Sequence, residues 1–203
     1  AFSRQIDRNA VAAFLRNNYV PGDCSIYEGV DKVPPGTLLR FDANAQQHTI
    51  RYWSLAEVVR KGIAEPIARP EDAQGELTSL LQDSVKKQMV SDVPLGGLLS
   101  GGIDSSLVVA MMQRASSKPV ETFTIGFADR EFDESTYAAA IARHLGTSHH
   151  EVHLSPEDAM AIIPDLPGIY DEPFADSSQI PTCLLSRIVR RNVTVALSGD
   201  GGD

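Results

Sequence analysis

The stretch "VPLGGLLSGGIDSSLVVAMM", Val93 to Met112, decides the fold. An apolar run enters a turn of small residues, and an apolar helical segment follows. Such a strand-to-helix turn usually holds an anion on bare backbone N–H groups. This turn carries the carboxylate of Asp104 and no lysine. It therefore predicts a phosphate site at which a cation, most naturally Mg²⁺, bridges the carboxylate and the ligand.

The composition narrows the class of protein. The chain has 203 residues, of which 42% are hydrophobic and 22% charged, which is enough for a globular core. The net charge of −9 and the lack of a basic stripe argue against a nucleic-acid surface. No segment resembles a signal peptide or reaches membrane-spanning length, so we expect a cytoplasmic protein. Cys24 and Cys183 form no C-x-x-C pair and are interpreted as reduced thiols.

Both ends of the chain look cut. The first residue is Ala1 rather than Met, and the last residues, "ALSGDGGD", stop on a glycine-rich turn. A strand-to-helix turn needs its helix to cover the sheet face behind it. We therefore expect a fragment of a longer chain that is inactive by itself.

A change of pattern along the chain predicts two parts. Residues 1–59 form a small β-rich part, with a helix near the start followed by short strands and a hairpin. Residues 60–70 are polar, contain two prolines and are interpreted as a linker. In residues 71–203 strands alternate with helices, beginning with a long helix. This alternation predicts an α/β fold, a parallel sheet with helices on both faces.

A second glycine-rich turn, residues 198–203 ("SGDGGD"), ends another buried strand. We call residues 100–106 ("SGGIDSS") the first loop and residues 198–203 the second loop. Parallel sheets bind ligands at the carboxyl ends of their strands. If the two strands are neighbours, Asp203 can face Asp104 across the phosphates and share a Mg²⁺ ion with it.

Simpler interpretations of the first loop and of other polar residues stay open. The loop lacks both the Walker ending and the G-x-G-x-x-G spacing, and the plainest alternative is a tight turn with Asp104 as helix N-cap. The helix is expected to begin at Ser105. Three histidines on one predicted strand alternate between faces, which favours structural roles over a metal site. They are His149, His150 and His153.

An acidic run follows the strand at residues 120–127. It comprises Asp129, Glu131, Asp133 and Glu134. The run is interpreted as a solvated surface, or as the rim of the nucleotide site, since it directly follows a strand end.

These motifs together resemble a known family. "LLSGGIDSS" is similar to the pyrophosphate loop of the ATP-pyrophosphatase superfamily, whose fold is adenine nucleotide alpha hydrolase-like. With the downstream "LSGDGGD", the chain resembles the glutamine-hydrolysing B type of asparagine synthetase. "KVPPGTLLRF" looks like the closing hairpin of that family's glutaminase domain, and "TFTIGF", "LGTSHHEVH" and "YDEPFADSS" resemble further family segments. The similarity runs from about residue 25 to residue 203.

The resemblance implies a role for each matched residue. The first loop would hold the ATP phosphates and then pyrophosphate, while Asp104 and Asp203 would bind Mg²⁺. Asp200 and Asp104 would be the catalytic acidic residues, Asp200 being tied to formation of the acyl-adenylate. The residues expected to bind ATP are Leu99, Ser100, Gly101, Gly102, Ile103, Asp104, Ser105, Ser106, Ile125, Ser198 and Gly199.

The implied reaction activates the aspartate β-carboxylate as an adenylate and releases pyrophosphate. Ammonia derived from glutamine then displaces AMP, giving asparagine and glutamate. The resemblance admits a homodimer of the full-length protein and implies no nucleic-acid or membrane partner. Cys24 does not match the family's N-terminal cysteine nucleophile, and "EPFADSS" replaces a Thr/Arg-containing stretch of some members.

Several alternatives therefore stay open. One is a related amidotransferase that adenylates another carboxylate. Another is a synthetase of the same superfamily that acts on a nucleobase, an NAD precursor or a tRNA uridine. The last is a non-catalytic nucleotide-binding module.

Overall fold

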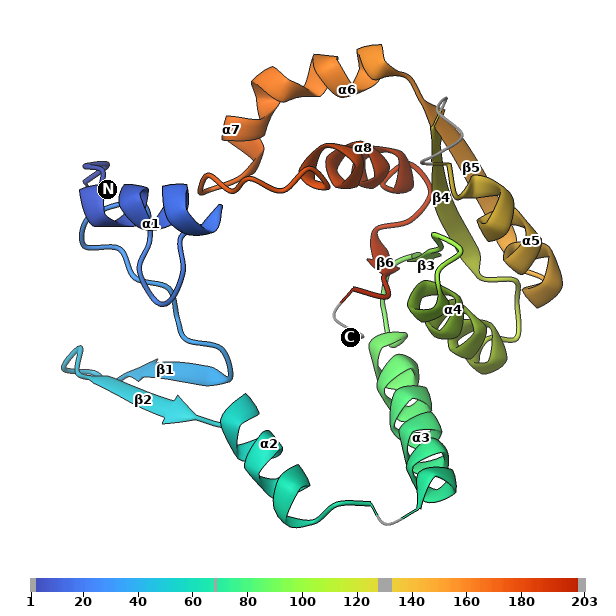
Figure 1. Cartoon of the computed structure of the whole chain (residues 1–203), viewed down its shortest axis with the longest axis horizontal. Helices are drawn as coiled ribbons and strands as arrows, with labels where there is room; N and C mark the ends of the chain where they lie inside the picture. Colours follow the sequence, from blue (N-terminus) through green and yellow to red (C-terminus); the bar gives the residue numbers. More distant parts are fainter. Residues whose placement is uncertain (1–2, 68, 128–132, 201–203) are drawn as a thin grey trace. The chain divides into compact units, whose positions relative to one another are not determined.

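A computed structural model describes residues 3–67, 69–127 and 133–200. Contacts divide the chain into two compact units (Figure 1). The N-terminal unit comprises Ala1–Ala68 and Asp165–Ser177, and the sheet unit comprises Arg69–Pro164 and Ser178–Asp203. We call residues 165–177 the late segment, because it follows most of the sheet unit in sequence but packs with the N-terminal unit.

The sheet unit is built on four parallel strands. Their spatial order is β5 (Ser148–Leu154), β4 (Glu121–Phe127), β3 (Leu95–Leu98) and β6 (Val195–Leu197). Strand β3 lies between β4 and β6 and is parallel to both. Their carboxyl ends therefore meet at one edge of the sheet, and the predicted parallel α/β sheet is confirmed.

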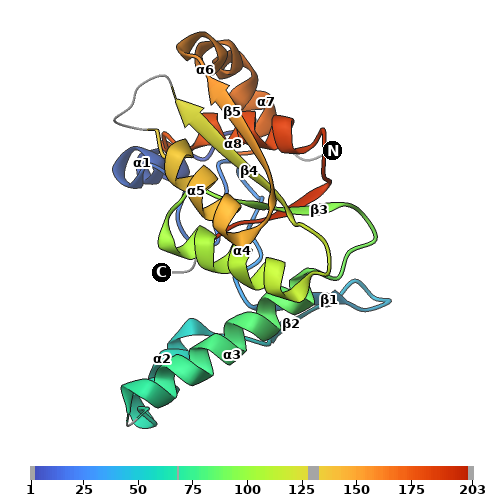
Figure 2. The ribbon, with the colours of Figure 1, turned by 90° about the vertical axis from the view of Figure 1, so that its right-hand side faces the viewer.

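Helices cover both faces of this sheet (Figure 2). On one face α4 (Ile103–Ala115) contacts β3, and α5 (Ser135–Leu145) contacts β4 and β5. On the other face α8 (Gln179–Val189) contacts β4. Helix α3 (Pro70–Gln88) packs on α4, and α6 (Pro156–Ile162), continued by the 3₁₀ turn Ile163–Asp165, packs on α8.

The core of the sheet unit follows from the alternation of residues along β3 and β4. Leu99 packs with Val109 and Ala138 on the α4 and α5 face. Phe123, only 1% exposed, packs with Val189 on the α8 face. Apolar side chains on both faces keep the strands buried, as expected for a parallel sheet.

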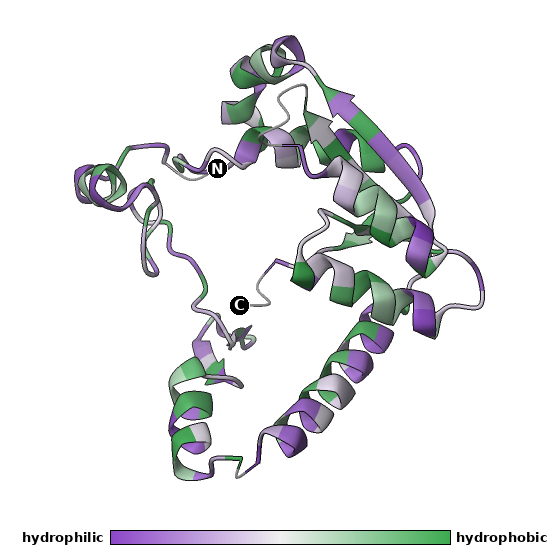
Figure 3. Cartoon of the chain, turned by 45° about the vertical axis from the view of Figure 1, so that its right-hand side comes forward, coloured by the Kyte–Doolittle hydropathy of each residue, from purple (hydrophilic) through white to green (hydrophobic). Residues whose placement is uncertain are grey.

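Helix α3 contributes only its last turns to this core. Val85 is buried with Met111 and Met112 of α4. Leu77 and Leu80 lie on the predicted apolar face yet are 57% and 60% exposed. Hydrophilic and hydrophobic residues alternate along this helix (Figure 3). The first half of α3 therefore presents an uncovered apolar stripe within the described part of the chain.

The N-terminal unit contains α1 (Arg8–Asn17) and a hairpin of β1 (Thr37–Phe41) and β2 (Gln47–Arg51). Asp7 caps α1 by accepting a hydrogen bond of 2.7 Å from the amide of Asn9. Both the helix and the hairpin are as the sequence predicts. The unit also contains α2 (Leu55–Ala64) and, within the late segment, the short α7, which comprises residues 166–169.

The structure differs from the predicted linker over residues 60–70. Residues 60–64 belong to α2, and α3 already begins at Pro70. The reason is that Leu55, Val58 and Ile63 form one stripe at helical spacing that runs past residue 60. The domain ranges 1–59, 60–70 and 71–203 stay a prediction for the whole protein. Among the described residues, no helix is long and apolar enough to cross a membrane.

Candidate functional site

The two glycine-rich loops lie side by side at the carboxyl edge of the sheet. Strands β3 and β6 are paired, with Gly97 opposite Leu197, so the two loops leave neighbouring strands. A Cβ atom added to Gly199 would lie 2.6 Å from the Ser105 nitrogen and 2.9 Å from the Asp104 carbonyl carbon. Gly199 of the second loop thus packs directly on the first turn of α4, and glycine is required for this approach.

Serine hydroxyls fix the shape of the first loop. The Ser105 hydroxyl donates to the Gly102 carbonyl at 3.3 Å and accepts from the Ser100 amide at 3.2 Å. The Ser100 and Ser105 hydroxyl oxygens are 2.9 Å apart, and Ser106 donates to the same Gly102 carbonyl at 2.5 Å. Ser105 is buried. The hydroxyls of Ser105 and Ser106 therefore hydrogen-bond within the loop itself and stabilise its shape.

Gly101 gives the first loop a backbone conformation that other residues rarely adopt. Its φ is +91°, and an added Cβ would lie 2.9 Å from the Tyr137 Cβ on α5. Glycine is therefore required twice, for the dihedral angle and for the close approach of α5.

The amino end of α4 has no side-chain cap within the described residues. Its N-cap is Gly102, which has no side chain to accept from the first-turn amides of Ile103, Asp104 and Ser105. Exposed amides at a helix N-terminus favour an anion. The helix begins at Ile103 rather than at Ser105, and Asp104 lies inside the first turn. The interpretation of Asp104 as the N-cap is therefore wrong.

A cleft of about 470 Å³ opens between these loops, the ends of β3 and β4, and α8. A cavity of this size lies within the range of small-molecule sites. Gly101, Ile103 and Ser106 belong to the first loop but do not line the cleft. Asp203 lies outside the described residues. The predicted residues that do line it are Leu99, Ser100, Gly102, Asp104, Ser105, Ile125, Ser198, Gly199 and Asp200.

The apolar wall of the cleft was largely missed by the sequence reasoning. Phe123 and Phe127 flank Ile125 at alternate positions on β4, so the period of two could have found them. The α8 side of the wall had no such signal, because it depends on how α8 packs over β4. The missed lining residues are Leu98, Phe123, Thr124, Phe127, Pro181, Thr182 and Leu185.

The acidic run after β4 divides into two roles. Glu134 lines the cleft, as the rim interpretation expects. Asp133 instead binds Ser135, whose side-chain and backbone hydrogen bonds hold the pKa of the Asp133 carboxyl below its usual range. Asp129 and Glu131 lie outside the described residues.

The three histidines on β5 have separate partners. His150 lies 2.5 Å from a Glu121 oxygen and stacks on Phe123. His153 pairs with Glu151 at 2.7 Å. The described residues hold no group of three or more side chains that could share a metal ion. These separate contacts fit the structural roles expected from the sequence.

The third histidine, His149, contacts the buried Thr122 hydroxyl through Nδ1 at 3.0 Å. Thr122 in turn lies 2.9 Å from the Thr147 hydroxyl, which donates to the Ala142 carbonyl. This order of donors leaves Thr122 to donate to Thr147 and to accept from His149 Nδ1–H. His149 Nε2 is then a buried lone pair without a partner among the described residues. Burial lowers the pKa of the His149 imidazole.

The donor set of the cleft fits a magnesium ion bound together with phosphate. The carboxylates of Asp104 and Asp200 line the same space as the first-turn amides of α4. Asp104 is exposed and has no hydrogen bond or ion pair within the described ranges. Mg²⁺ takes hard oxygen ligands, commonly one or two carboxylates with substrate phosphates.

The fold and this cleft define a parallel α/β protein with a candidate small-molecule site beside two glycine-rich loops. Its site lies at the carboxyl ends of neighbouring strands, as sites of such sheets do. A profile of the asparagine synthase family matches residues 76–203, and the chain belongs to that family.

Curated relatives match nearly the whole chain. A Methanocaldococcus jannaschii protein, provisionally named asparagine synthetase [glutamine-hydrolyzing] 2, is 36% identical over 200 residues, covering 98% of this chain and 38% of that protein. Asparagine synthetase [glutamine-hydrolyzing] 1 of Bacillus subtilis is 32% identical, covering 98% and 30%. The chain thus spans about a third of the length of these relatives. Among solved structures, an NH3-dependent NAD synthetase from Campylobacter jejuni shares 15% identity with a TM-score of 0.41, covering 60% of this chain and 54% of that one.

Proposed function

We propose that the protein containing this chain is an ATP-dependent asparagine synthetase. It activates the β-carboxylate of aspartate as an acyl-adenylate with release of pyrophosphate. Ammonia from glutamine then displaces AMP to give asparagine. The observation that carries this proposal is the packing of Gly199 on Asp104 and Ser105, which joins the two loops in one cleft.

The cleft has an apolar part suited to the adenosine portion of ATP. Phe123, Ile125 and Phe127 project from one face of β4, and Leu185 of α8 lines the same space. Leu99 and the second loop complete the lining. An adenine ring can stack on or lie against such side chains without a charged partner.

The triphosphate would lie at the first loop. No side chain caps the first-turn amides of α4, and Ser100 and Gly102, which directly precede this turn, line the cleft. Charge that develops on the departing pyrophosphate is stabilised by these fixed donors, and the serine network keeps them in place. Because the donors are held before the reaction, little reorganisation is needed when the charge appears.

The acidic residues complete the site. Asp104 and Asp203 would hold Mg²⁺, which neutralises phosphate charge when bound. Asp200 lines the cleft, and its amide donates to the Ser198 hydroxyl at 3.3 Å. Asp200 would be the acidic residue next to the forming acyl-adenylate, the role that the family resemblance implies. A cytoplasmic location, expected because no segment resembles a signal peptide or membrane span, stays a prediction, as does the homodimer that the family resemblance admits.

Isotope exchange between labelled pyrophosphate and ATP tests this function on the full-length protein. Exchange that needs both aspartate and Mg²⁺ is expected, because adenylation is reversible while pyrophosphate is present. Glutamate in place of aspartate, and omission of any amino acid, are the controls. Exchange with another carboxylate and none with aspartate would overturn the acceptor. ATP binding without exchange for any acceptor would favour a non-catalytic module.

A further inference from the structure

His150 lies on the edge strand of the sheet, yet it contacts a residue of the cleft. Strand β5 pairs with β4 and places His150 opposite Phe123, so both side chains lie on the same face of the sheet. Their ring centroids are 5.0 Å apart and the ring planes differ by 14°, which is a stacked arrangement. Phe123 lines the cleft together with Ile125 and Phe127, whereas His150 does not. His150 therefore supports the apolar wall from outside the cleft.

A hydrogen bond to Glu121 sets the orientation of the His150 ring. The Glu121 Oε2 atom lies 2.5 Å from His150 Nε2 and also accepts a hydrogen bond of 3.2 Å from the Ser148 hydroxyl. A carboxylate only accepts hydrogen bonds, so His150 donates from Nε2–H. Because one ring makes both contacts, the hydrogen bond also fixes the plane that the imidazole presents to Phe123.

Apolar packing confines Phe123 in the other directions. A Cβ atom added to Gly96 on β3 would lie 2.8 Å from Phe123 Cε2, so the phenyl ring occupies space that glycine leaves open. Phe123 also packs in one cluster with Val189 of α8 and with Val193. Towards the sheet edge, the stacked neighbour of Phe123 is the imidazole of His150. The imidazole is thus the contact that bounds the phenyl ring on the β5 side.

The exposure of this pair indicates what it contributes. The side chains of His150 and Glu121 are 38% and 39% exposed, and ion pairs with such exposure add little to stability. Phe123, by contrast, is 1% exposed, and its ring keeps one orientation only while its neighbours fill the space around it. Removing the imidazole would let the phenyl ring turn into the vacated space, and a bound ligand would then have to order it again. The pair therefore serves the shape of the apolar wall more than the stability of the sheet.

We propose that His150 is a positioning residue of the cleft: stacked on Phe123 and oriented by Glu121, it fixes the part of the apolar wall that receives the adenosine portion of ATP. It acts through Phe123 and is not part of either glycine-rich loop. His150 should therefore affect how well ATP binds and leave unchanged the binding of pyrophosphate, which the loops would hold. The part of this inference that concerns ATP rests on the proposed function, whereas the stacking itself does not.

Pyrophosphate exchange on the full-length protein tests this role, because it gives KM for ATP and KM for pyrophosphate separately. His150→Leu keeps apolar bulk but removes the stack, and it should raise KM for ATP roughly fivefold, with KM for pyrophosphate and the maximal rate unchanged. His150→Phe restores a stacked ring and should bring KM for ATP back to within about twofold of the parent value. His153→Leu is the matched control, since this histidine of β5 pairs with Glu151 and does not line the cleft.

Glu121 gives an independent test that leaves the imidazole in place. Glu121→Gln keeps an acceptor for His150 Nε2–H and should behave as the parent protein does. Glu121→Leu frees the imidazole to turn and should raise KM for ATP roughly two- to threefold. These two variants decide the question if His150→Leu does not fold.

Three results would overturn the role of His150. They are an unchanged KM for ATP in His150→Leu, an equal rise in His150→Phe, and a joint rise of both KM values, which would indicate general loosening of the sheet unit. Calorimetric titration with ATP separates these results from failure of the proposed function. If the parent protein binds ATP but shows no aspartate-dependent exchange, the proposed function fails, and the dissociation constants of the same variants still decide the role of His150. A parent protein that binds no ATP would overturn both.

Discussion

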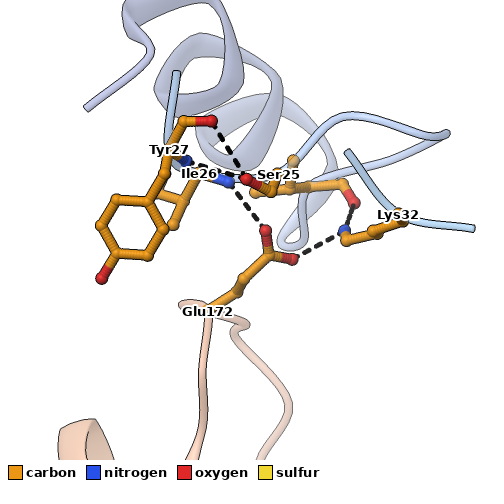
Figure 4. Close-up of polar contacts among 6 residues, drawn as sticks. Ser25, Ile26, Tyr27, Lys32 and Glu172 are labelled. Atoms are coloured by element: carbon orange, nitrogen blue, oxygen red, sulfur yellow. Dashed lines mark hydrogen bonds and ion pairs between the residues drawn. The ribbon is translucent and has the colours of Figure 1, made fainter. Parts of the chain in front are cut away.

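The sheet unit and the N-terminal unit bring residues together in different ways. In the sheet unit, the first loop follows β3 and leads into α4, and the second loop follows β6. Because β3 pairs with β6, Gly199 lies beside Ser105 without help from a distant segment. In the N-terminal unit, residues 3–67 are joined by a segment that lies about a hundred residues later. The first arrangement follows from general rules of parallel sheets. The second depends on particular side chains such as Glu172, whose carboxylate accepts a hydrogen bond from the Ile26 amide (Figure 4).

Asp104→Asn gives the largest expected effect and would disable the cleft without touching the N-terminal unit. Mg²⁺-dependent turnover of the full-length protein should fall by roughly 10²–10³-fold, the usual size of an effect when one electrostatic group of a reacting site is removed. Stability should hardly change, because the Asp104 side chain is exposed. Asp92→Asn, at another exposed carboxylate, is the control for the change of charge. Full activity of the Asp104 variant would refute the metal role.

The site in the sheet unit was predictable because it depends on local sequence. Small residues at the end of an apolar run mark a strand end, and parallel strands end at one edge. Nine predicted residues line the cleft for this reason. The start of α4 was missed by two residues because Gly102 serves as N-cap although it has no capping side chain. The sequence had favoured a polar cap.

The rest was not predictable because it depends on packing between distant segments. One wall of the cleft forms because α8 lies over β4. The α8 residues in this wall are Pro181, Thr182 and Leu185, and they belong to no recognisable motif. Likewise, nothing in the segment "YDEPFADSS" indicates that Glu172 binds the Ile26 amide. Helix α2 was missed for another reason: Pro66 and Pro70 follow it closely, so its last residues were grouped with the polar, proline-containing stretch that was interpreted as a linker.

Gly199→Ala would disrupt the contact between the two loops of the sheet unit. The added methyl group would lie 2.6 Å from the Ser105 nitrogen, a backbone atom that cannot move alone. We expect a loss of ~1–3 kcal/mol of stability, as for other overpacked sites, and at least about tenfold weaker ATP binding. Calorimetric titration and thermal unfolding measure the two effects.

Gly75→Ala is the matched control for this substitution. An added Cβ at Gly75 on α3 meets nothing within 4 Å, so alanine should stabilise the helix by ~0.5–1 kcal/mol and leave ATP binding unchanged. Normal ATP affinity in the Gly199 variant would show that the two loops need not touch for nucleotide binding.

Gly36→Ala tests whether damage confined to the N-terminal unit leaves the cleft of the sheet unit intact. Gly36 has a φ of +66°, and an added Cβ would clash with the Trp53 carbonyl oxygen at the base of the hairpin. Loss of ~1–3 kcal/mol from this unit is expected, seen as faster hydrogen exchange in residues 37–51, with ATP binding unchanged. Gly22→Ala has a similar φ without the clash and should cost less. A large loss of ATP affinity in Gly36→Ala would contradict the separation of the two units.

Lowering the pH should reduce the stability of the sheet unit through His149, and this is the smallest effect that we predict. Burial lowers the pKa of this imidazole below 6.5; Glu151 raises the pKa by a smaller amount, and His150 lowers it further. Below pH 6.5 the unfolded chain therefore binds the proton that the folded chain excludes, so stability is full above that pH and falls as the pH is lowered through it. His149→Gln should flatten this fall in urea unfolding measured between pH 7.5 and pH 5, whereas the exposed His144→Gln should not. An unchanged slope in the His149 variant would mean that its buried Nε2 accepts a proton at little cost.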